Sequence, residues 1–194
     1  MILLLSTRNP GKIAEIRLLL SDLPIALRSV SEIDGAPFVE EDADTLEGNA
    51  RKKAETLHAF GGLPALADDT GLEVDALGGL PGVQSARFAG LQADDAANRR
   101  KLLADLQAAR DRSARFRTVI ALADETGTRF FEGVCRGTII DEERGSKGFG
   151  YDRIFVPEGG NRTFAELDAE EKNAISHRGA ALRRLAAYLH DQAG

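Results

Sequence analysis

The chain of 194 residues is long enough for a substantial buried core, and we expect residues 1–194 to form a single domain. Its formal net charge of −6 argues against a nucleic-acid-binding protein, because phosphate backbones require a basic surface. No apolar run is long enough to span a membrane, and the single cysteine, Cys135, allows no internal disulfide. We therefore expect a cytoplasmic protein with a buried thiol and no contact with membranes.

The N-terminal segment has the pattern of a strand that leads directly into a helix. Residues 2–6 are apolar, and the apolar residues of 12–22 recur at helical spacing. The connection is Thr7-Arg-Asn-Pro-Gly-Lys12, a polar loop that ends on a lysine at the start of the helix. Free N–H groups and the lysine favour an anion there. The loop lacks two residues of the phosphate-binding P-loop, and by itself it is equally typical of any strand-to-helix connection.

A second strand over 25–30, an irregular acidic connection over 31–41 and a helix from 44 to about 60 are predicted next. Asp44 and Glu47 have the spacing of a capping box, and Gly61-Gly62 is typical of a helix end.

The stretch Leu66-Ala-Asp-Asp-Thr-Gly-Leu-Glu-Val-Asp75 brings two adjacent acids to the end of an apolar run. We predict strands over 64–67 and 72–76 with a turn at Thr70-Gly71. Neighbouring side chains of an extended segment alternate, so Asp68 and Asp69 are expected to point in different directions. Acids in such a place commonly hold a divalent cation over phosphate. An ordinary Asx-turn explains this stretch equally well.

The second half of the chain is predicted to mix helices with antiparallel strands. A Gly- and Pro-rich loop or lid is expected over 77–92. It is followed by a helix over 95–109, by strands over 115–124, 128–136, 138–141 and 154–156, and by a final helix over 176–190.

The segment before the final helix has the composition of a base-binding loop. Gly148 and Gly150 allow close approach of the backbone to a ligand, and Phe149 and Tyr151 offer flat faces for a base. Ser176 is expected to cap the final helix, which places His177 and Arg178 in its first turn. The helix dipole disfavours cations there, so this pair favours a ligand rich in acceptors. A solvated basic helix start is the alternative interpretation.

Eight short motifs occur in one order over almost the whole chain. They are Thr7-x-Asn9-x-x-Lys12, Glu40-Glu41, Asn49-Ala50, Ala67-Asp-Asp-Thr-Gly71, Gly78-Gly-Leu-Pro-Gly82, Ser85-Ala-Arg87, Gly148-Phe-Gly-Tyr-Asp152 and Glu171-Lys-Asn-Ala-Ile-Ser-His-Arg178. The set resembles the inosine/xanthosine triphosphate pyrophosphatase family. The resemblance implies an α/β fold with an elongated mixed β-sheet flanked by helices, in two lobes with the active-site cleft between them. It also implies a homodimer and Mg²⁺-dependent hydrolysis of dITP, ITP or XTP to the monophosphate and pyrophosphate, which cleanses the nucleotide pool.

The same resemblance implies roles for individual residues. Asp69 is the candidate general base, and Glu40 and Asp69 are the expected Mg²⁺ ligands, with Glu41 and Asp68 as alternatives. The residues expected to bind the purine nucleoside triphosphate are Thr7, Arg8, Asn9, Pro10, Gly11, Lys12, Lys53, Thr70, Phe149, Gly150, Tyr151, Asp152, Lys172, His177 and Arg178. Lys12, Lys53 and Lys172 are assigned to the phosphates, and the Phe149–Asp152 segment with His177 and Arg178 to the base. For Lys172 alone, an i+4 pair with Asp168 on a surface turn is the alternative.

Arg8 and Arg153 differ from the residues that are commonest at these positions of the motifs. The differences affect the detail of the loops and remove no chemical group that the reaction needs. A related pyrophosphatase family with a Ser-x-Ser-Pro-Arg-Arg opening is disfavoured by the loop after Ser6. A catalytically inactive nucleotide-binding regulator is disfavoured because Glu40, Asp68 and Asp69 are all present. A purely structural dimer module leaves the two acids, the Gly-Lys connection and the His-Arg pair unexplained.

Overall fold

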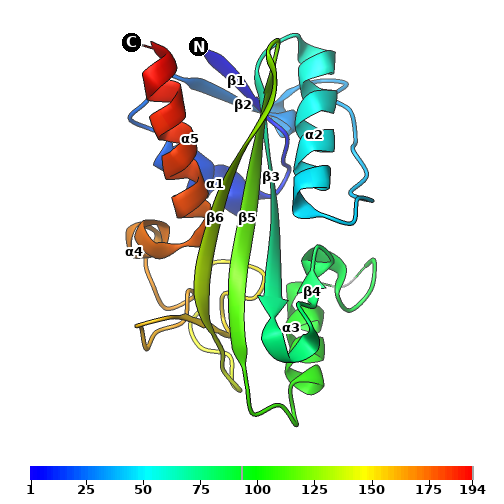
Figure 1. Ribbon diagram of the computed structural model, residues 1–194, viewed down its shortest axis with the longest axis vertical. Helices are drawn as coiled ribbons and strands as arrows, with labels where there is room; N and C mark the ends of the chain where they lie inside the picture. Colours follow the sequence, from blue (N-terminus) through cyan, green and yellow to red (C-terminus); the bar gives the residue numbers. More distant parts are fainter. Residues whose placement is uncertain (93, 194) are drawn as a thin grey trace. The chain divides into compact units, whose positions relative to one another are not determined.

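The computed structural model describes residues 1–92 and 94–193, which form an α/β fold with a mixed sheet (Figure 1). The strands are β1 (Ile2–Leu5), β2 (Ala26–Ser29), β3 (Ala65–Val74), β4 (Pro81–Gly82), β5 (Ser113–Asp124), β6 (Gly127–Ile139) and β7 (Phe155–Pro157). The helices are α1 (Pro10–Leu19), α2 (Leu46–Gly61), α3 (Asp95–Asp105), α4 (Ala169–Ile175) and α5 (His177–Ala193). Three short 3₁₀ turns, η1 (Val30–Glu32), η2 (Asp75–Leu77) and η3 (Ser85–Arg87), complete the described elements.

The sheet has the strand order β2-β1-β3-β5-β6-β7, and β4 pairs with β3 outside this path. β1 is parallel to both β2 and β3, whereas β4 and β7 are antiparallel to their partners. The parallel pairs are joined through helices, α1 between β1 and β2 and α2 before β3, as parallel strands require. The predicted α/β class with a mixed sheet and flanking helices is therefore confirmed.

The chain divides into two compact units. The first unit comprises residues 1–69, 118–133 and 178–194, and the second comprises residues 70–117 and 134–177. β3, β5 and β6 each contribute residues to both units. Each unit has its own hydrophobic core.

In the first unit, the side chains of β1 alternate between two apolar layers. Leu3 and Leu5 pack in a cluster with residues of α1 and α5, while Leu4 packs with Leu57 of α2. α1 and α5 accordingly cover one face of these strands, and α2 covers the other (Figure 1). Burial on both faces explains why β1 reads as a continuous apolar run and not as an alternating pattern.

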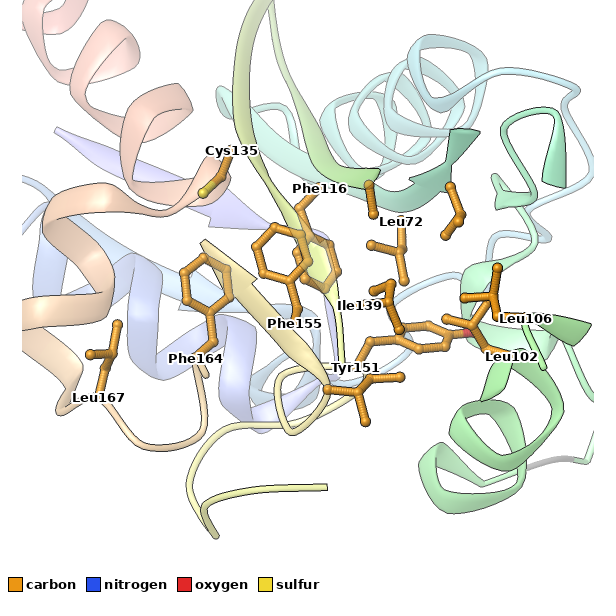
Figure 2. Close-up of a cluster of buried hydrophobic side chains, with 13 residues drawn as sticks. Leu72, Leu102, Leu106, Phe116, Cys135, Ile139, Tyr151, Phe155, Phe164 and Leu167 are labelled. Atoms are coloured by element: carbon orange, nitrogen blue, oxygen red, sulfur yellow. The ribbon is translucent and has the colours of Figure 1, made fainter. Parts of the chain in front are cut away.

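In the second unit, the core is rich in aromatic rings. Phe155 of β7 lies between Phe116 and Phe164 (Figure 2), with ring centroids 4.7 Å and 5.1 Å from theirs. The ring of Tyr151 extends from the segment before β7 toward Leu102 of α3 and Leu106, the residue that caps the end of this helix. These contacts fix the segment that contains the predicted base-binding loop.

β3 is one uninterrupted strand through the two acids, so the predicted turn at Thr70-Gly71 is wrong. Its first half pairs with β1, and its second half pairs with β4, where Leu72 lies opposite Gly82. A side chain at Gly71 would place its Cβ 2.6 Å from the carbonyl oxygen of Gly82. Gly71 therefore permits close approach of another backbone segment rather than a change of chain direction.

Several element boundaries also differ from the sequence predictions. Thr45, and not Asp44, caps α2, with its Oγ1 accepting from the N–H of Gly48. The predicted strands over 128–136 and 138–141 form one strand, β6. β7 lies directly against β6 at Gly137, where a Cβ would collide with the backbone of Val156. α4 was not predicted, although Asp168 and Glu171 form the capping box that marks its start.

Candidate active site

The side chain of Asp68 anchors a buried group of charges in the first unit. Its Oδ2 lies 3.0 Å from the Nζ of Lys12 and 3.1 Å from the Nη2 of Arg178. The Nε of Arg178 approaches the same oxygen at 3.3 Å. Lys12 comes from the first turn of α1 and Arg178 from the start of α5, so one carboxylate joins three elements that are distant in sequence.

Glu15 completes this group and was missed by the sequence analysis. Its carboxylate forms a second ion pair with Arg178, through the Nη1 of the guanidinium. Glu15 lies three residues after Lys12 on α1, so the two side chains share a helix face. That spacing was the available signal. Arg178 is 1% exposed, and both of its ends are held by carboxylates.

The interactions between these charges determine whether the side chains of Asp68 and Arg178 are ionised. Burial alone would raise the pKa of Asp68, but the cations of Lys12 and Arg178 outweigh it and hold that pKa well below its usual range. Burial likewise opposes the charge of Arg178, yet Asp68 and Glu15 raise the pKa of the guanidinium. Asp68 is therefore ionised throughout the physiological range.

Asp69 points to a different group of residues, as the alternation along an extended strand predicts. Its Oδ2 accepts a hydrogen bond of 3.1 Å from the amide of Asn49, and its Oδ1 lies 3.7 Å from the Nζ of Lys53. Lys53 also contacts the carboxylate of Glu41 at 2.5 Å and the carbonyl oxygen of Asp68 at 2.7 Å. Asn49 and Lys53 lie one turn apart on α2 and are buried.

The environment of Asp69 is suited to proton transfer. Burial raises the pKa of its carboxyl above the ordinary value, and the nearby Lys53 ammonium offsets this only in part. A raised pKa makes a carboxylate a stronger base. The two adjacent acids thus differ in chemistry: Asp68 is neutralised by two cations, whereas Asp69 is the stronger base.

The carboxylates near Lys53 could provide part of a Mg²⁺ site. Asp69 and Glu41 both approach its Nζ, and Glu40, which precedes Glu41 in the sequence, is exposed. Within residues 1–92 and 94–193, no group of three or more His, Cys, Asp or Glu side chains is arranged to hold a metal. Mg²⁺ commonly uses only one or two carboxylates together with substrate phosphates and water. The donor set therefore fits an ion that is bound jointly with a phosphate substrate.

The loop between Ser6 and α1 differs from the anion-binding loop that its sequence suggested. The Oδ1 of Asn9 accepts from the N–H groups of Gly11 and Lys12, so Asn9 caps α1 and occupies two amides that were expected to face an anion. Pro10 is the first helical residue, where its missing N–H costs nothing. Arg8 is exposed, with Nη2 3.4 Å from the carbonyl oxygen of Ala36. Thr7 is half-buried and accepts from the N–H of Asn9.

In the second unit, Asp152 organises the predicted base-binding loop. Its Oδ2 accepts from the N–H of Phe149 at 2.9 Å and from the Nζ of Lys172 at 2.8 Å. Gly148 has φ +73°, and a Cβ at this position would collide with the Asp152 carboxylate. The glycine is therefore required for the tight fold of the loop around Asp152.

Lys172 belongs to this loop. Its ammonium lies 5.0 Å from the ring centre of Phe149 and 5.7 Å from that of Phe164, a cation–π arrangement. Lys172 is buried, so the interpretation as a surface pair with Asp168 is wrong; Asp168 caps α4 instead. These contacts associate Lys172 with the base-binding loop.

The two aromatic side chains of the loop have different roles. Tyr151 is 4% exposed, and its hydroxyl donates to the carbonyl oxygen of Ser85 at 2.8 Å, so it is part of the core and not a stacking surface. Phe149 remains half-exposed. His177 is buried, and its ring stacks on Phe116 with centroids 4.5 Å apart. Phe149 is thus the aromatic residue of this segment that can offer a face to a base.

Comparison with known proteins decides the family. The sequence profile of the Ham1 family matches residues 3–188. The chain belongs to the Ham1 family. Two relatives named dITP/XTP pyrophosphatase, from Porphyromonas gingivalis and Geobacter sulfurreducens, are 50% and 49% identical over 188 and 190 residues, and each alignment covers 96% of both proteins. The resemblance inferred from the eight motifs is confirmed.

Solved structures of the Ham1 family agree with the fold. A HAM1 protein from Coxiella burnetii is 45% identical with a TM-score of 0.90, and the match covers 98% of this chain and 99% of that one. The Ham1 protein of Staphylococcus aureus is 38% identical with a TM-score of 0.89, over 99% and 100% of the two chains.

Two further expectations concern the remainder of the chain. Cys135 is buried, and burial raises the pKa of its thiol to about 11, so it is a structural residue as predicted. In the part of the chain that the structure describes, no helix combines the length and the apolar character needed to cross a membrane.

Proposed function

We propose that this protein is a nucleoside triphosphate pyrophosphatase that hydrolyses dITP, ITP and XTP to the monophosphate and pyrophosphate. The proposal is carried by the near full-length similarity to enzymes named dITP/XTP pyrophosphatase. The buried acids and cations of β3, α1, α2 and α5 support it, because phosphoryl chemistry requires positioned charges and an activated water more than covalent catalysis.

The phosphate groups are bound by the cations of the first unit. A triphosphate carries roughly four negative charges, which Lys12 and Lys53 partly neutralise. Lys12 is held by Asp68 and Lys53 by Glu41 and Asp69, so both ammonium groups are ordered before substrate binds. Arg178 assists by holding Asp68 in place, since Asp68 and Glu15 occupy its guanidinium. We retain Arg178, together with His177, as a proposed base-binding residue, as the sequence predicted.

Asp69 is the general base of the proposed reaction. It removes a proton from a water molecule, the water oxygen bonds to phosphorus, and the anhydride bond between the α- and β-phosphates breaks. Pyrophosphate leaves with the electron pair of that bond, and the proton remains on Asp69 until it is released to solvent. The raised pKa of Asp69 supports this assignment, and Asn49 and Lys53 fix the orientation of its carboxylate.

Mg²⁺ is the proposed cofactor, with Asp69 and Glu40 as ligands and Glu41 as the alternative. When bound, the ion would neutralise phosphate charge and lower the pKa of a coordinated water. Asp68 is a weaker candidate than the sequence indicated, because Lys12 and Arg178 already neutralise the oxygen that faces them.

The purine base is recognised by the Phe149–Asp152 loop with Lys172. Phe149 offers a stacking face, and the ammonium of Lys172 is a donor. Hypoxanthine and xanthine carry a carbonyl acceptor at C6, where adenine carries an amino donor. A donor aimed at this position leaves the adenine group unpaired, which costs roughly 1–3 kcal/mol and disfavours ATP.

We further infer that the protein removes non-canonical purine nucleotides from the nucleotide pool of the cytoplasm as a homodimer. These statements rest on the family resemblance. Light scattering coupled to size-exclusion chromatography would measure the oligomeric state directly, and a mass of about 20.8 kDa would contradict the dimer.

The proposed activity is tested with a panel of purified ITP, dITP, XTP, GTP and ATP in the presence of Mg²⁺. Pyrophosphate and orthophosphate release are scored separately. We expect rapid pyrophosphate release from the first three substrates and slow release from ATP. Equal rates on ATP, or orthophosphate as the primary product, would overturn the proposal.

A further inference from the structure

α3 binds both backbone polar groups of one residue of the base-binding loop, Gly150. The N–H of Gly150 donates to the Oδ2 of Asp95 at 2.7 Å, and its carbonyl oxygen accepts from the Nη1 of Arg99, also at 2.7 Å. Asp95 and Arg99 are four residues apart on α3 and therefore lie on one helix face. The peptide groups around Gly150 are thus fixed from both sides.

Arg99 is itself held rigidly. Its Nε and Nη2 bond to the two carboxylate oxygens of Glu143 at 2.8 Å and 3.2 Å, a bidentate pair. Arg99 is only 6% exposed, although it carries a full charge on a helix surface. Burial of an arginine costs stability unless its donors are satisfied, and here the carbonyl of Gly150 accepts from the third nitrogen.

Residues 141–148, which precede the loop, are exposed and lie outside every helix and strand. Backbone hydrogen bonds connect Arg144 to Arg153, and Ser146 and Lys147 to Ala165, but these bonds do not involve Gly150. Gly150 has φ +59°, a conformation available to glycine but strained for other residues. After Gly150 in the sequence, the hydroxyl of Tyr151 donates to the carbonyl oxygen of Ser85, and the carboxylate of Asp152 accepts from the N–H of Phe149. The bonds to α3 therefore fix the part of the loop that carries the exposed edge of Phe149.

We propose that Asp95 and Arg99 are positioning residues that hold Gly150, and with it Phe149, in the conformation that recognises the purine base. This inference rests on the proposed function, since it assigns the base to this loop. Loss of either contact should allow the loop to move. A shift of about 1 Å in a recognition group is enough to lower binding and selectivity strongly.

The test compares Arg99→Met with Arg100→Met, the same substitution at the adjacent exposed arginine of the same helix. We expect Arg99→Met to raise KM for ITP and weaken IMP binding about tenfold, the effect of losing a charged hydrogen bond. Its kcat and its inhibition by pyrophosphate, which lacks a base, should remain as in the unmodified protein. Arg100→Met should behave as the unmodified protein in every assay.

Asp95 provides a second test that does not depend on the stability of Arg99 variants, because Asp95 is exposed. Asp95→Ala should reproduce the increase in KM for ITP, whereas Asp95→Asn, which retains an oxygen acceptor for the N–H of Gly150, should restore most of the affinity. Equal KM values for Asp95→Ala and Asp95→Asn, together with an unchanged KM in Arg99→Met, would overturn the proposal. So would equal losses of ITP and pyrophosphate binding.

Hydrogen–deuterium exchange of residues 147–152 without substrate separates this inference from the proposed function. Faster exchange in Arg99→Met and Asp95→Ala, but not in Arg100→Met, supports the positioning role even if the unmodified protein fails to hydrolyse ITP. Unchanged exchange in both variants would refute the role even if ITP is the substrate.

Discussion

Replacing Asp68 with asparagine should destabilise the protein strongly, although the two side chains have nearly the same size. Asp68 is 1% exposed, and its Oδ2 lies within 3.1 Å of both Lys12 and Arg178. Asparagine removes the negative charge and leaves the cations of Lys12 and Arg178 beside a neutral group. Breaking a buried ion pair on one side costs about 3–5 kcal/mol.

That loss corresponds to a decrease in Tm of roughly 6–20 °C, because 1 kcal/mol shifts Tm by about 2–4 °C in a domain of this size. The measurement is urea unfolding at pH 7 followed by circular dichroism, with the m-value compared between variants. Asp105→Asn is the matched control, because Asp105 forms an exposed i,i+4 pair with Lys101. Its expected effect is below about 0.5 kcal/mol.

The pH dependence distinguishes the lost charge from lost packing. The pKa of Asp68 is depressed in the folded state, so its ionisation stabilises the protein above the unfolded pKa of about 3.9. That stabilisation is lost as the pH falls from there toward the folded pKa. The difference between the unmodified protein and Asp68→Asn should therefore be full at pH 7 and shrink below about pH 4.

A double-mutant cycle with Arg178→Met gives the interaction directly, and we expect a coupling of roughly 1–3 kcal/mol between the two sites. A loss below about 1 kcal/mol in Asp68→Asn, or a difference that is independent of pH, would refute the reasoning that Asp68 is the charge that holds Lys12 and Arg178 together.

Asp69→Asn should retain the fold and reduce kcat by about 10²–10⁴, measured as pyrophosphate release from ITP, and near-normal turnover would exclude Asp69 as the base. Its Tm should be unchanged or higher, because an acid whose pKa is raised by burial costs stability when ionised. In the unmodified protein, kcat/KM for ITP should fall as the pH decreases through the raised pKa of Asp69, and this decrease should be absent from the residual activity of Asp69→Asn. Excess EDTA should abolish activity and leave Tm unchanged; full activity in the chelator would argue against Mg²⁺. Lys53→Met should weaken hydrolysis of all triphosphates together, whereas Lys52→Met, at the half-buried neighbour that pairs with Asp42, should have little effect. Equal effects of these two substitutions would contradict a phosphate-binding role for Lys53.

The sequence by itself predicted the family, the α/β class and the principal acids and cations. These are local properties: apolar periodicity marks the strands and helices, and short motifs retain their order along the chain. Alternation along an extended segment also predicted that Asp68 and Asp69 point in different directions, which the structure confirms.

The tertiary structure decided what each charged group does. Which of two adjacent acids meets two cations depends on the helices that pack against β3, and Arg178 is 110 residues away from Asp68 in the chain. Lys172 pairs with Asp152 in the loop and not with Asp168, one helical turn away. The ammonium is buried and needs a carboxylate beside it, whereas an exposed pair with Asp168 would contribute little to stability. Asp95 and Arg99 gave no functional signal of their own, and the only signal for Glu15 was its helical spacing from Lys12, since their significance lies in contacts with residues that only folding brings to them.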